Sequence, residues 1–500
     1  VINIITKDTM QTEGVLVGLQ LGGDHHRALF RHGSILENGD SWRYDLKSES
    51  IEHLQGVSLD AQKNMTFLPQ SIYDDSWNRS SMGFRFDHTS STGKYIISGD
   101  YKYIEQPDIS LLPTGNALYN SSSHLSSRWE HPSESGTFQQ VYVTSEQSDA
   151  GALGQGEETV IDWEGQKQYQ WKNHLINVGG GYRQWFFTYQ PGIYYFGEQD
   201  IRLWHTTLHD EWRVTDRFTL FSGARFDSHH IYDESVHPSI RATYQLDRLL
   251  WWAALSKAYR NPSRLENSSL IQVTYPQAIY RFVGNFKVEP EALTAYEVGV
   301  RHHYTSRFYW EMNLFQHSYD HLIGLTETFS LSSLGVPLVI QSSANESEQE
   351  VAGTELLMAM EYSNHLTFEV GYSYQNYSKN HQAGMTDFLL DSEPAHSRWN
   401  LNMAWRFMPN WFLHTSLVSV SDATAVYYDQ IRNALSTVDV HDYINANVRV
   451  AHNLHKNWEV AFLGKDLFHQ NSPEFYSYGV NLSPAGTISA SYAIESIWRF

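Results

Sequence analysis

The feature that most constrains this 500-residue chain is an alternation of apolar and polar residues that recurs in segments of about ten residues. In the last segment, from Ile488 to Phe500, isoleucine, tyrosine and tryptophan share one face, while serine, glutamate and arginine gather on the other. Successive side chains of a β-strand point to opposite faces, so a period of two predicts strands with one apolar and one polar face. The pattern recurs over 366–373, 399–407 and 444–450.

This alternation divides the chain into about 22 strands, an even number as single-chain bacterial β-barrels require. Thirteen strands follow from about residue 201. The nine earlier strands are expected near 14–22, 26–34, 41–50, 79–88, 94–103, 124–131, 137–145, 158–169 and 175–185. A soluble β-sandwich also alternates, so the pattern alone leaves that fold open.

The connections between strands separate the two folds, because they switch regularly between short and long. Tight turns are expected at 215–216, 247–248, 304–306, 363–365, 408–410 and 453–456. Long polar connections are expected at 228–236, 260–292, 318–350, 378–396, 421–441 and 467–486, following the odd-numbered strands. Short periplasmic turns and long extracellular loops are typical of outer-membrane proteins. The sequence therefore predicts an all-β fold, a transmembrane antiparallel β-barrel.

Composition agrees with a barrel and excludes several other classes. The mean hydropathy is −0.46 and no stretch reaches the roughly 18 apolar residues of a membrane-spanning helix, yet 14% of residues are aromatic. A barrel with a polar lumen and aromatic girdles accounts for both facts. The net charge of −21 argues against nucleic acid as a partner, and the absence of cysteine excludes disulfides and thiolate metal sites.

Five short motifs in the order of one family give a more specific indication. The opening Val1–Lys7 resembles the end of the plug domain in TonB-dependent outer-membrane receptors. Ser256–Ser263 resembles that family's Ser-x-Ala-(Phe/Tyr)-Arg-x-Pro-Ser segment. Glu289–Glu291, followed by Ala295–Gly299, resembles its Pro-Glu and Tyr-Glu-x-Gly pair.

The resemblance continues to the end of the chain. Val351–Glu355 is similar to the strand that usually reads Gly-x-Glu, and Ala490–Phe500 carries the family's terminal aromatic residue. One departure occurs at Lys465–Phe468, where members of the family commonly have Asn-Leu-(Phe/Tyr).

The resemblance implies a location, a domain division and an activity. Residues 1–8 would be the C-terminal tail of the plug and residues 9–500 the barrel, set among lipid and lipopolysaccharide in the outer membrane of a Gram-negative bacterium. The barrel would import a scarce nutrient, most often an iron–siderophore complex, with energy from the TonB–ExbB–ExbD system acting through the plug. Because the plug bears the energy-coupling segment, we expect this chain not to be energised by itself. A haem or cobalamin receptor of the same family, a passive porin-like barrel and a surface-binding barrel are the alternatives.

Aromatic and cationic residues in the connection 260–292 are the first candidates for ligand contact. Their rings and guanidinium could stack on, or pair with, an anionic ligand. The alternative is that they only order a long loop. These candidates are Tyr275, Tyr280, Arg281 and Phe282.

The 25 histidines raise the question of a metal or haem site. His229 and His230 open an external loop and are candidates for ligand contact, although neighbours in a strand point apart and rarely chelate one ion. The pair His302–His303 lies beside a predicted periplasmic turn, the wrong end for capture. Residues 261–290 contain no histidine, which argues against haem ligation there.

The chain carries no strong signature of an enzyme. It has no Gly-x-Ser-x-Gly elbow, no phosphate-binding glycine loop and no His-Glu-x-x-His motif. Gly179–Gly181 falls inside a predicted strand rather than at the start of a helix. The sequence therefore predicts a protein that is not an enzyme and that holds neither a cofactor nor a metal.

Overall fold

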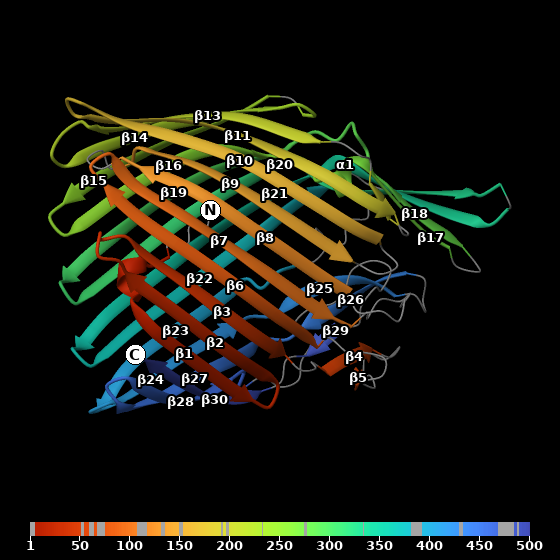
Figure 1. Ribbon diagram of the computed structural model, residues 1–500. Coiled ribbons are helices and arrows are strands. Elements are labelled where there is room, and N and C mark those ends of the chain that lie inside the picture. Colours follow the sequence, from red (N-terminus) through yellow and green to blue (C-terminus); the bar gives the residue numbers. More distant parts are fainter. Residues whose placement is uncertain are drawn as a thin grey trace.

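Twenty-two antiparallel strands close into a barrel, which forms the wall of the molecule (Figure 1). This confirms the predicted fold class. The structure, a computed structural model, describes residues 6–500 apart from 52–54, 60–64, 68–75, 108–117, 132–135, 150–153, 192–193, 197–199, 233, 275–277, 334, 382–392, 430–433, 469–484 and 488–489.

The strands of the barrel follow one another around the wall in chain order. They are β1 (Gly14–Gly22), β2 (His25–Ile35), β3 (Ser41–Ile51), β6 (Trp77–Ser90), β7 (Gly93–Gln106), β8 (Leu118–Glu130), β9 (Phe138–Asp149), β10 (Gly154–Trp171), β11 (His174–Pro191), β13 (Ile201–Arg213), β14 (Phe218–His229), β15 (Ser235–Leu246), β16 (Leu249–Arg260), β19 (Glu291–Thr305), β20 (Phe308–Leu331), β21 (Pro337–Ser363), β22 (Leu366–His381), β23 (Ser397–Met408), β24 (Trp411–Val420), β27 (Tyr443–His455), β28 (Trp458–Lys465) and β30 (Ser491–Arg499).

The remaining elements lie outside this ring. They are the 3-10 helix η1 (Thr9–Thr12), the helix α1 (Arg264–Ser268) and the strands β4 (Gln55–Leu59), β5 (Met65–Phe67), β12 (Tyr194–Phe196), β17 (Ser269–Thr274), β18 (Ile279–Val283), β25 (Ala423–Asp429), β26 (Ala434–Val440) and β29 (Ala485–Thr487). Within the described ranges, no helix has the length and apolar character needed to cross a membrane.

The ring closes where the first strand meets the last. β1 and β30 pair antiparallel, with Leu16 opposite Arg499. Phe500 extends the pairing, because its N–H donates to the Val15 carbonyl (2.8 Å) and its carbonyl accepts from the Val15 N–H (3.0 Å). Gly14 has a φ of +89°, and a Cβ there would lie 2.2 Å from the Phe500 carbonyl oxygen, so glycine is required at this corner.

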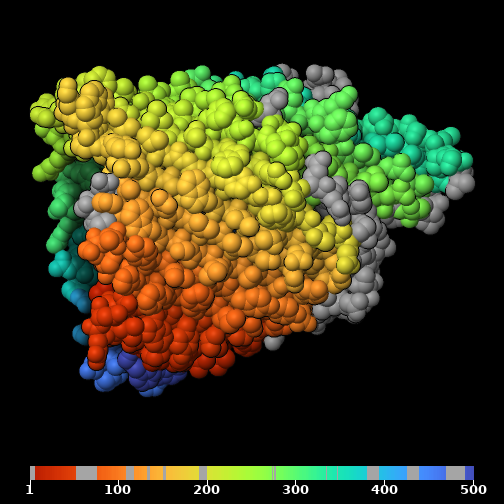
Figure 2. All heavy atoms as spheres, turned by 45° about the horizontal axis from the view of Figure 1, so that its top comes forward, coloured from red at the N-terminus to blue at the C-terminus, as the bar shows by residue number. Residues whose placement is uncertain are grey.

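Apolar side chains cover the outside of the wall. Leu21, Trp204 and Ile494 are 66%, 58% and 58% exposed, as expected of residues that meet lipid rather than a core. The buried apolar residues among those described are nearly all alanine or valine, because the barrel has no interior apolar core. Figure 2 shows the wall as a continuous surface.

Charged side chains pair across neighbouring strands on the inner face. The Arg449 guanidinium, for example, lies 2.7 Å from Glu459 Oε1 and 2.6 Å from Glu495 Oε1. Such pairs satisfy charges that face a polar lumen. Glu495, which the alternation of the last strand predicted to face the lumen, is one of these inward residues.

The segment 6–13 lies against the inner wall near the short turns. Asp8 Oδ1 lies 3.0 Å from both Arg85 Nη2 and Lys94 Nζ. The Thr9 side chain is buried and lies 2.6 Å, Oγ1 to Oγ, from Ser41. Side chains from three strands of the wall therefore hold this segment in place.

The short turns lie where they were predicted, at the left end in Figure 1, together with the C-terminus. Asp247 and Asn410 adopt positive φ values of 49° and 65° in two of these turns. Asp and Asn tolerate the left-handed region better than other non-glycine residues, which explains their use here.

The segment Lys465–Phe468, where the sequence departs from the family's usual motif, forms a hydrogen-bonded corner. Asp466 has a φ of +54°, its N–H donates to Asn447 Oδ1 (3.1 Å), and its carboxylate accepts a hydrogen bond from Asn445. The Leu467 N–H donates to the Ala446 carbonyl (3.0 Å) and holds the corner to the neighbouring strand.

Two expectations about the long connections were wrong. Residues 318–350 were predicted as a loop, but β20 and β21 continue through most of this range as one hairpin that projects beyond the barrel rim (Figures 1 and 2). Long loops were also predicted after every odd-numbered strand of the barrel. The first barrel strand does not follow this rule, because only residues 23–24 separate β1 from β2.

Candidate functional site

The rim opposite the short turns carries a folded cap built from the connection 261–290. Its base is fixed by Arg260, the last residue of β16. The Arg260 Nε lies 2.5 Å from Glu291 Oε2, and its two terminal nitrogens lie 3.1 and 2.9 Å from the Glu266 carboxylate oxygens. Arg260 therefore joins both ends of the connection, and we call Arg260, Glu266 and Glu291 the Arg260 clamp.

Helix α1 begins the cap with a capping box. The Ser263 Oγ accepts from the Glu266 N–H (3.2 Å), and a Glu266 carboxylate oxygen accepts from the Ser263 N–H (2.6 Å). Burial raises the pKa of Glu266, but the hydrogen bonds from Arg260 and Ser263 outweigh it, so that this pKa lies below its usual value. Glu266 is therefore ionised at neutral pH and serves the clamp and the helix together.

The cap continues as the hairpin of β17 and β18, which joins other strands outside the ring. β17 pairs with β12, and β18 pairs parallel with the outer part of β21. Gly284 follows the hairpin, and a Cβ there would lie 2.6 Å from the Ser268 nitrogen. Three connections therefore build one extracellular sheet (Figure 1).

The structure places three of the four aromatic and cationic candidates in β18. Tyr280 and Phe282 lie two residues apart and Arg281 lies between them on the other face of the strand. Arg281 donates to the Gln272 side-chain oxygen of β17, at 2.7 and 3.1 Å, so it is used within the hairpin. Tyr275 lies outside the described residues.

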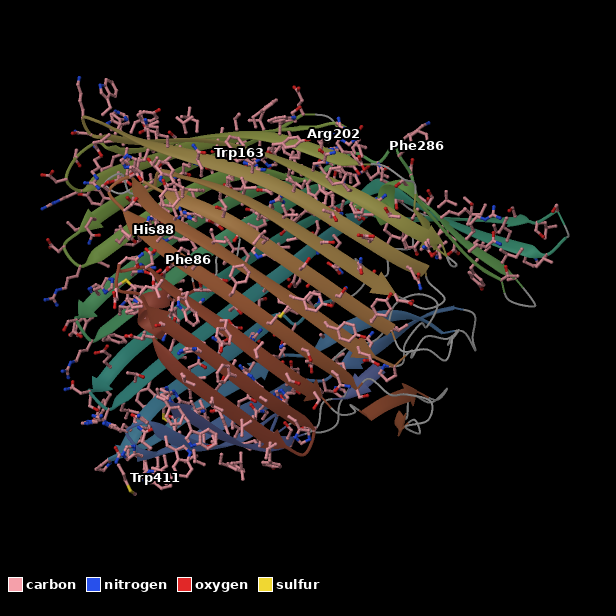
Figure 3. All side chains as sticks on the ribbon, viewed as in Figure 1. Phe86, His88, Trp163, Arg202, Phe286 and Trp411 are labelled. Carbon is pink, nitrogen blue, oxygen red and sulfur yellow. The ribbon has the colours of Figure 1, made fainter. Side chains whose placement is uncertain are left out.

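The histidine candidates lie at the extracellular end of β14. The rings of His229 and His230 stack at 5.9 Å, and Tyr232 lies 4.8 Å from His229. Burial, with a further contribution from His230, lowers the pKa of His229 to about 4. His230 Nδ1 accepts from the backbone N–H of Arg202 (3.0 Å), which is labelled in Figure 3.

These histidines are involved in packing rather than free to chelate. The Tyr232 hydroxyl donates to the Pro262 carbonyl (2.8 Å), which ties the loop after β14 to the start of the cap. His302 and His303 lie at the turn end of β19, as predicted. Within the described parts of the chain, no group of three His, Asp or Glu residues could hold a metal ion.

The structure reveals a set of residues that the sequence analysis did not single out. Arg264 of α1 lies over the ring of Phe187 on β11, 3.7 Å from Cζ to the ring centroid. Trp185 and Arg183 precede Phe187 by two and four residues in that strand and lie on the same inner face. The Arg183 Cζ lies 5.5 Å from the Trp185 ring, its Nε donates to the Asp162 carboxylate, and its Nη2 donates to the Tyr142 hydroxyl (2.6 Å).

We call Arg264, Phe187, Trp185, Arg183 and Tyr142 the mouth ladder, because they descend from the cap along the inner wall. The guanidinium groups of Arg264 and Arg183 lie at either end of the Phe187 and Trp185 rings, whose side chains are only half-buried. Guanidinium groups bind anions by charge-assisted hydrogen bonds, and rings stack on flat ligands. The ladder can therefore contact an anionic ligand that contains planar rings as it enters the lumen.

Comparisons with known proteins agree with this architecture. The profile of the family described as TonB dependent receptor-like, beta-barrel, matches residues 24–466. No curated protein matches the chain.

Several solved structures share the fold at low sequence identity. The siderophore receptor PirA from Acinetobacter baumannii is 13% identical, with a TM-score of 0.76 over 97% of this chain and 80% of that one. The FrpB iron transporter from Neisseria meningitidis is 12% identical, with a TM-score of 0.75 over 97% and 81%. A mutant of the ferric enterobactin receptor PfeA from Pseudomonas aeruginosa, in complex with enterobactin, is 12% identical, with a TM-score of 0.72 over 97% and 81%.

The family profile covers most of the chain, and the 22-stranded barrel is the fold of that family. The chain therefore belongs to the TonB-dependent receptors, which lie in the outer membrane of Gram-negative bacteria and act as transporters rather than enzymes.

Proposed function

We propose that this receptor takes up a ferric siderophore, an anionic iron chelate, through the mouth ladder. The observation that carries the proposal is the series Arg264, Phe187, Trp185 and Arg183, in which an arginine of α1 and an arginine of β11 enclose two aromatic rings on the inner face of β11. Solved structures of the same fold bear the names of siderophore receptors and an iron transporter, which supports this ligand class over haem or cobalamin.

The energies of such contacts fit stepwise passage into the lumen. A cation–π contact contributes about 0.5–2 kcal/mol, and a hydrogen bond to a charged group about 1.5–3 kcal/mol. Each contact is small beside the roughly 8 kcal/mol of a micromolar complex, so no single step of the ladder holds the ligand firmly. The ligand can then move from Arg264 to Arg183 without leaving a single very strong site.

We further infer that residues 1–8 are the tail of a plug domain and that the TonB–ExbB–ExbD system acts on the receptor through that plug. The contacts of Asp8 with Arg85 and Lys94 support this inference, because they hold the segment inside the lumen.

The test measures binding of ferric siderophores to the purified receptor through the quenching of tryptophan fluorescence. Arg264→Ala should weaken binding about tenfold, as expected for the loss of one charge-assisted contact. Lys287→Ala is the matched control, because it removes a positive charge from the same cap at a residue with no ion pair among those described, and it should bind like the wild type.

Uptake of radioactive iron by cells that carry either variant gives the functional counterpart. Equal affinities for the two variants would show that the mouth ladder does not contact the ligand. If no ferric chelate binds while ions pass freely through the barrel in a planar bilayer, the protein is a passive pore and the proposal fails.

A further inference from the structure

The outer wall carries a hollow of about 480 Å³ between β8, β9, β10 and β11, near the short-turn end of these strands. Two glycines open it. Gly165 and Gly180 face outward and bring no side chain to the surface. The next outward residues of the same strands, Trp163 and Val178, have large side chains that are 41% and 45% exposed. Trp163, labelled in Figure 3, lies on the outer side of the wall. The hollow therefore faces the membrane rather than the lumen.

Aromatic rings line the hollow at the level of the membrane interface. Trp129 forms one side, where its indole N–H donates to the Thr92 carbonyl (3.1 Å) at a short turn. Further along β10, Tyr169 and Trp171 point outward and are exposed. Tyrosine and tryptophan at this height mark the boundary between acyl chains and lipid headgroups. The hollow therefore opens where a headgroup meets its chains.

A single cation lies at the rim of this hollow. Lys167 is exposed on the outward face of β10, and its Nζ lies 5.1 Å from the centroid of the Tyr169 ring. It forms no ion pair with any residue that the structure describes. Lys167 lies four residues before the end of the strand, about 13 Å along it, within reach of the headgroup layer.

A second hollow on the same outer wall shows what is distinctive about the first. It measures about 520 Å³ between β14, β15, β16, β19 and β20 and is lined by apolar residues such as Trp251, Val298 and Leu314. Its lining includes no lysine or arginine. Of these two hollows in the described part of the wall, the one beside Lys167 has a lysine in its lining.

We propose that the hollow beside Lys167 is a binding site for one phospholipid of the periplasmic leaflet. The lysine ammonium binds the headgroup phosphate, and the first part of an acyl chain lies over Gly165 and Gly180 against Trp129 and Trp163. Charge complementarity selects a phosphate-bearing lipid, and the absence of two side chains admits its chain. The site lies on the outside of the barrel and is separate from the mouth ladder.

The test is native mass spectrometry of the receptor in a non-ionic detergent, titrated with phosphatidylglycerol. Lys167→Gln should weaken retention of the first lipid about tenfold, because it removes the phosphate partner but keeps the length of the side chain. Lys172→Gln is the matched control. Lys172 also lies beside an aromatic ring, 5.2 Å from Trp171, but does not line the hollow, so retention should be unchanged.

Two further measurements distinguish recognition of phosphate from recognition of chains. Gly165→Leu fills the hollow without changing charge and should reduce retention as strongly as Lys167→Gln. Diacylglycerol with the same chains should bind much more weakly than phosphatidylglycerol. The proposal is overturned if Lys167→Gln and Lys172→Gln retain lipid equally, or if diacylglycerol binds as well as phosphatidylglycerol. If inorganic phosphate alone displaces the lipid at equal concentration, the site recognises the free anion and the proposal also fails.

Discussion

Replacing Arg260 with alanine should loosen the cap over the barrel mouth and leave the wall intact. Arg260 makes three contacts, one to Glu291 and two to Glu266, and these tie both ends of the connection 261–290 together. The β17–β18 hairpin between those ends pairs with β12 and β21. Loss of the clamp therefore favours local opening of the cap.

The size of the effect follows from the number and exposure of the contacts. A hydrogen bond to a charged group contributes about 1.5–3 kcal/mol when buried. The Arg260 side chain is 49% exposed, and solvent weakens each of its contacts. We therefore assign each contact a free energy close to that of an exposed ion pair, about 0.2–1 kcal/mol. Three contacts then sum to about 2 kcal/mol, equivalent to about a 30-fold change in the opening equilibrium.

Hydrogen exchange of the β17 and β18 amides measures this opening directly. We expect protection factors about 30-fold lower in Arg260→Ala and unchanged in the charge-matched control Lys287→Ala. Amides of β10 should exchange alike in all three proteins. Equal protection of the hairpin in Arg260→Ala and the wild type would refute the reasoning, because the clamp would then contribute nothing to the cap.

Low pH should open the cap of the wild-type protein in the same way as the Arg260→Ala substitution. The pKa of Glu266 in the folded cap lies below its ordinary value of 4.5, so the clamp contributes fully above that pH and is lost as the pH falls through the folded value. Protection factors of the hairpin should therefore fall only below about pH 4.5. Arg260→Ala should show a smaller pH dependence in that window.

Two further predictions concern the wall and the mouth. Gly353→Ala places a Cβ 2.3 Å from the Tyr374 carbonyl oxygen and should destabilise the barrel by about 1–3 kcal/mol. The temperature at which the compact band of the folded barrel disappears in gel electrophoresis should therefore fall. Gly23→Ala, whose added Cβ would have nothing within 4 Å, should leave that temperature unchanged. The pKa of His229 of about 4 keeps its ring neutral at pH 6. The order of its loop should therefore be lost as the pH falls from 6.5 toward 4. Histidine NMR spectra, assigned with His229→Gln, test this, and a titration midpoint of His229 near 6.5 would contradict it.

The wall could be predicted from the sequence because its determinants are local. Each strand has lipid on one side and a polar lumen on the other, so a period of two appears in the residues themselves. Asp247 and Asn410 mark their turns through conformations that few residues adopt. Closure into a ring then follows from the cost of an unpaired edge in lipid.

The cap could not be predicted in the same way. Beyond the rim neither face of β20 and β21 meets lipid, so the contrast between an apolar and a polar face that marks the wall is not required there. The pairing of β18 with β21 joins Ile279 to Leu338, and nothing local in either segment encodes the partner. The candidates Tyr280 and Phe282 were therefore placed in a loop when they belong to a strand.

The mouth ladder left a signal in the sequence that the alternation obscured. Trp185, Phe186 and Phe187 are three successive aromatic residues, so at least one must point into the lumen. Phe186 points outward and is 36% exposed, as expected for a lipid-facing residue. An aromatic residue on the polar face of a strand is therefore a useful indication of a ligand path, which a search for apolar and polar alternation overlooks.

The pairing of β1 with β30 constrains the order in which this chain can be built into a membrane. β1 is the first strand of the barrel in the sequence, and its partners, residues 493–499, belong to the last strand of the barrel. Until they arrive, one edge of β1 presents N–H and carbonyl groups that cost several kcal/mol each in hydrocarbon. Insertion of the complete ring is therefore strongly favoured over insertion of a part of it. A chain that ended only nine residues early would lack β30 and leave β1 and β28 as two open edges that cannot remain in the bilayer.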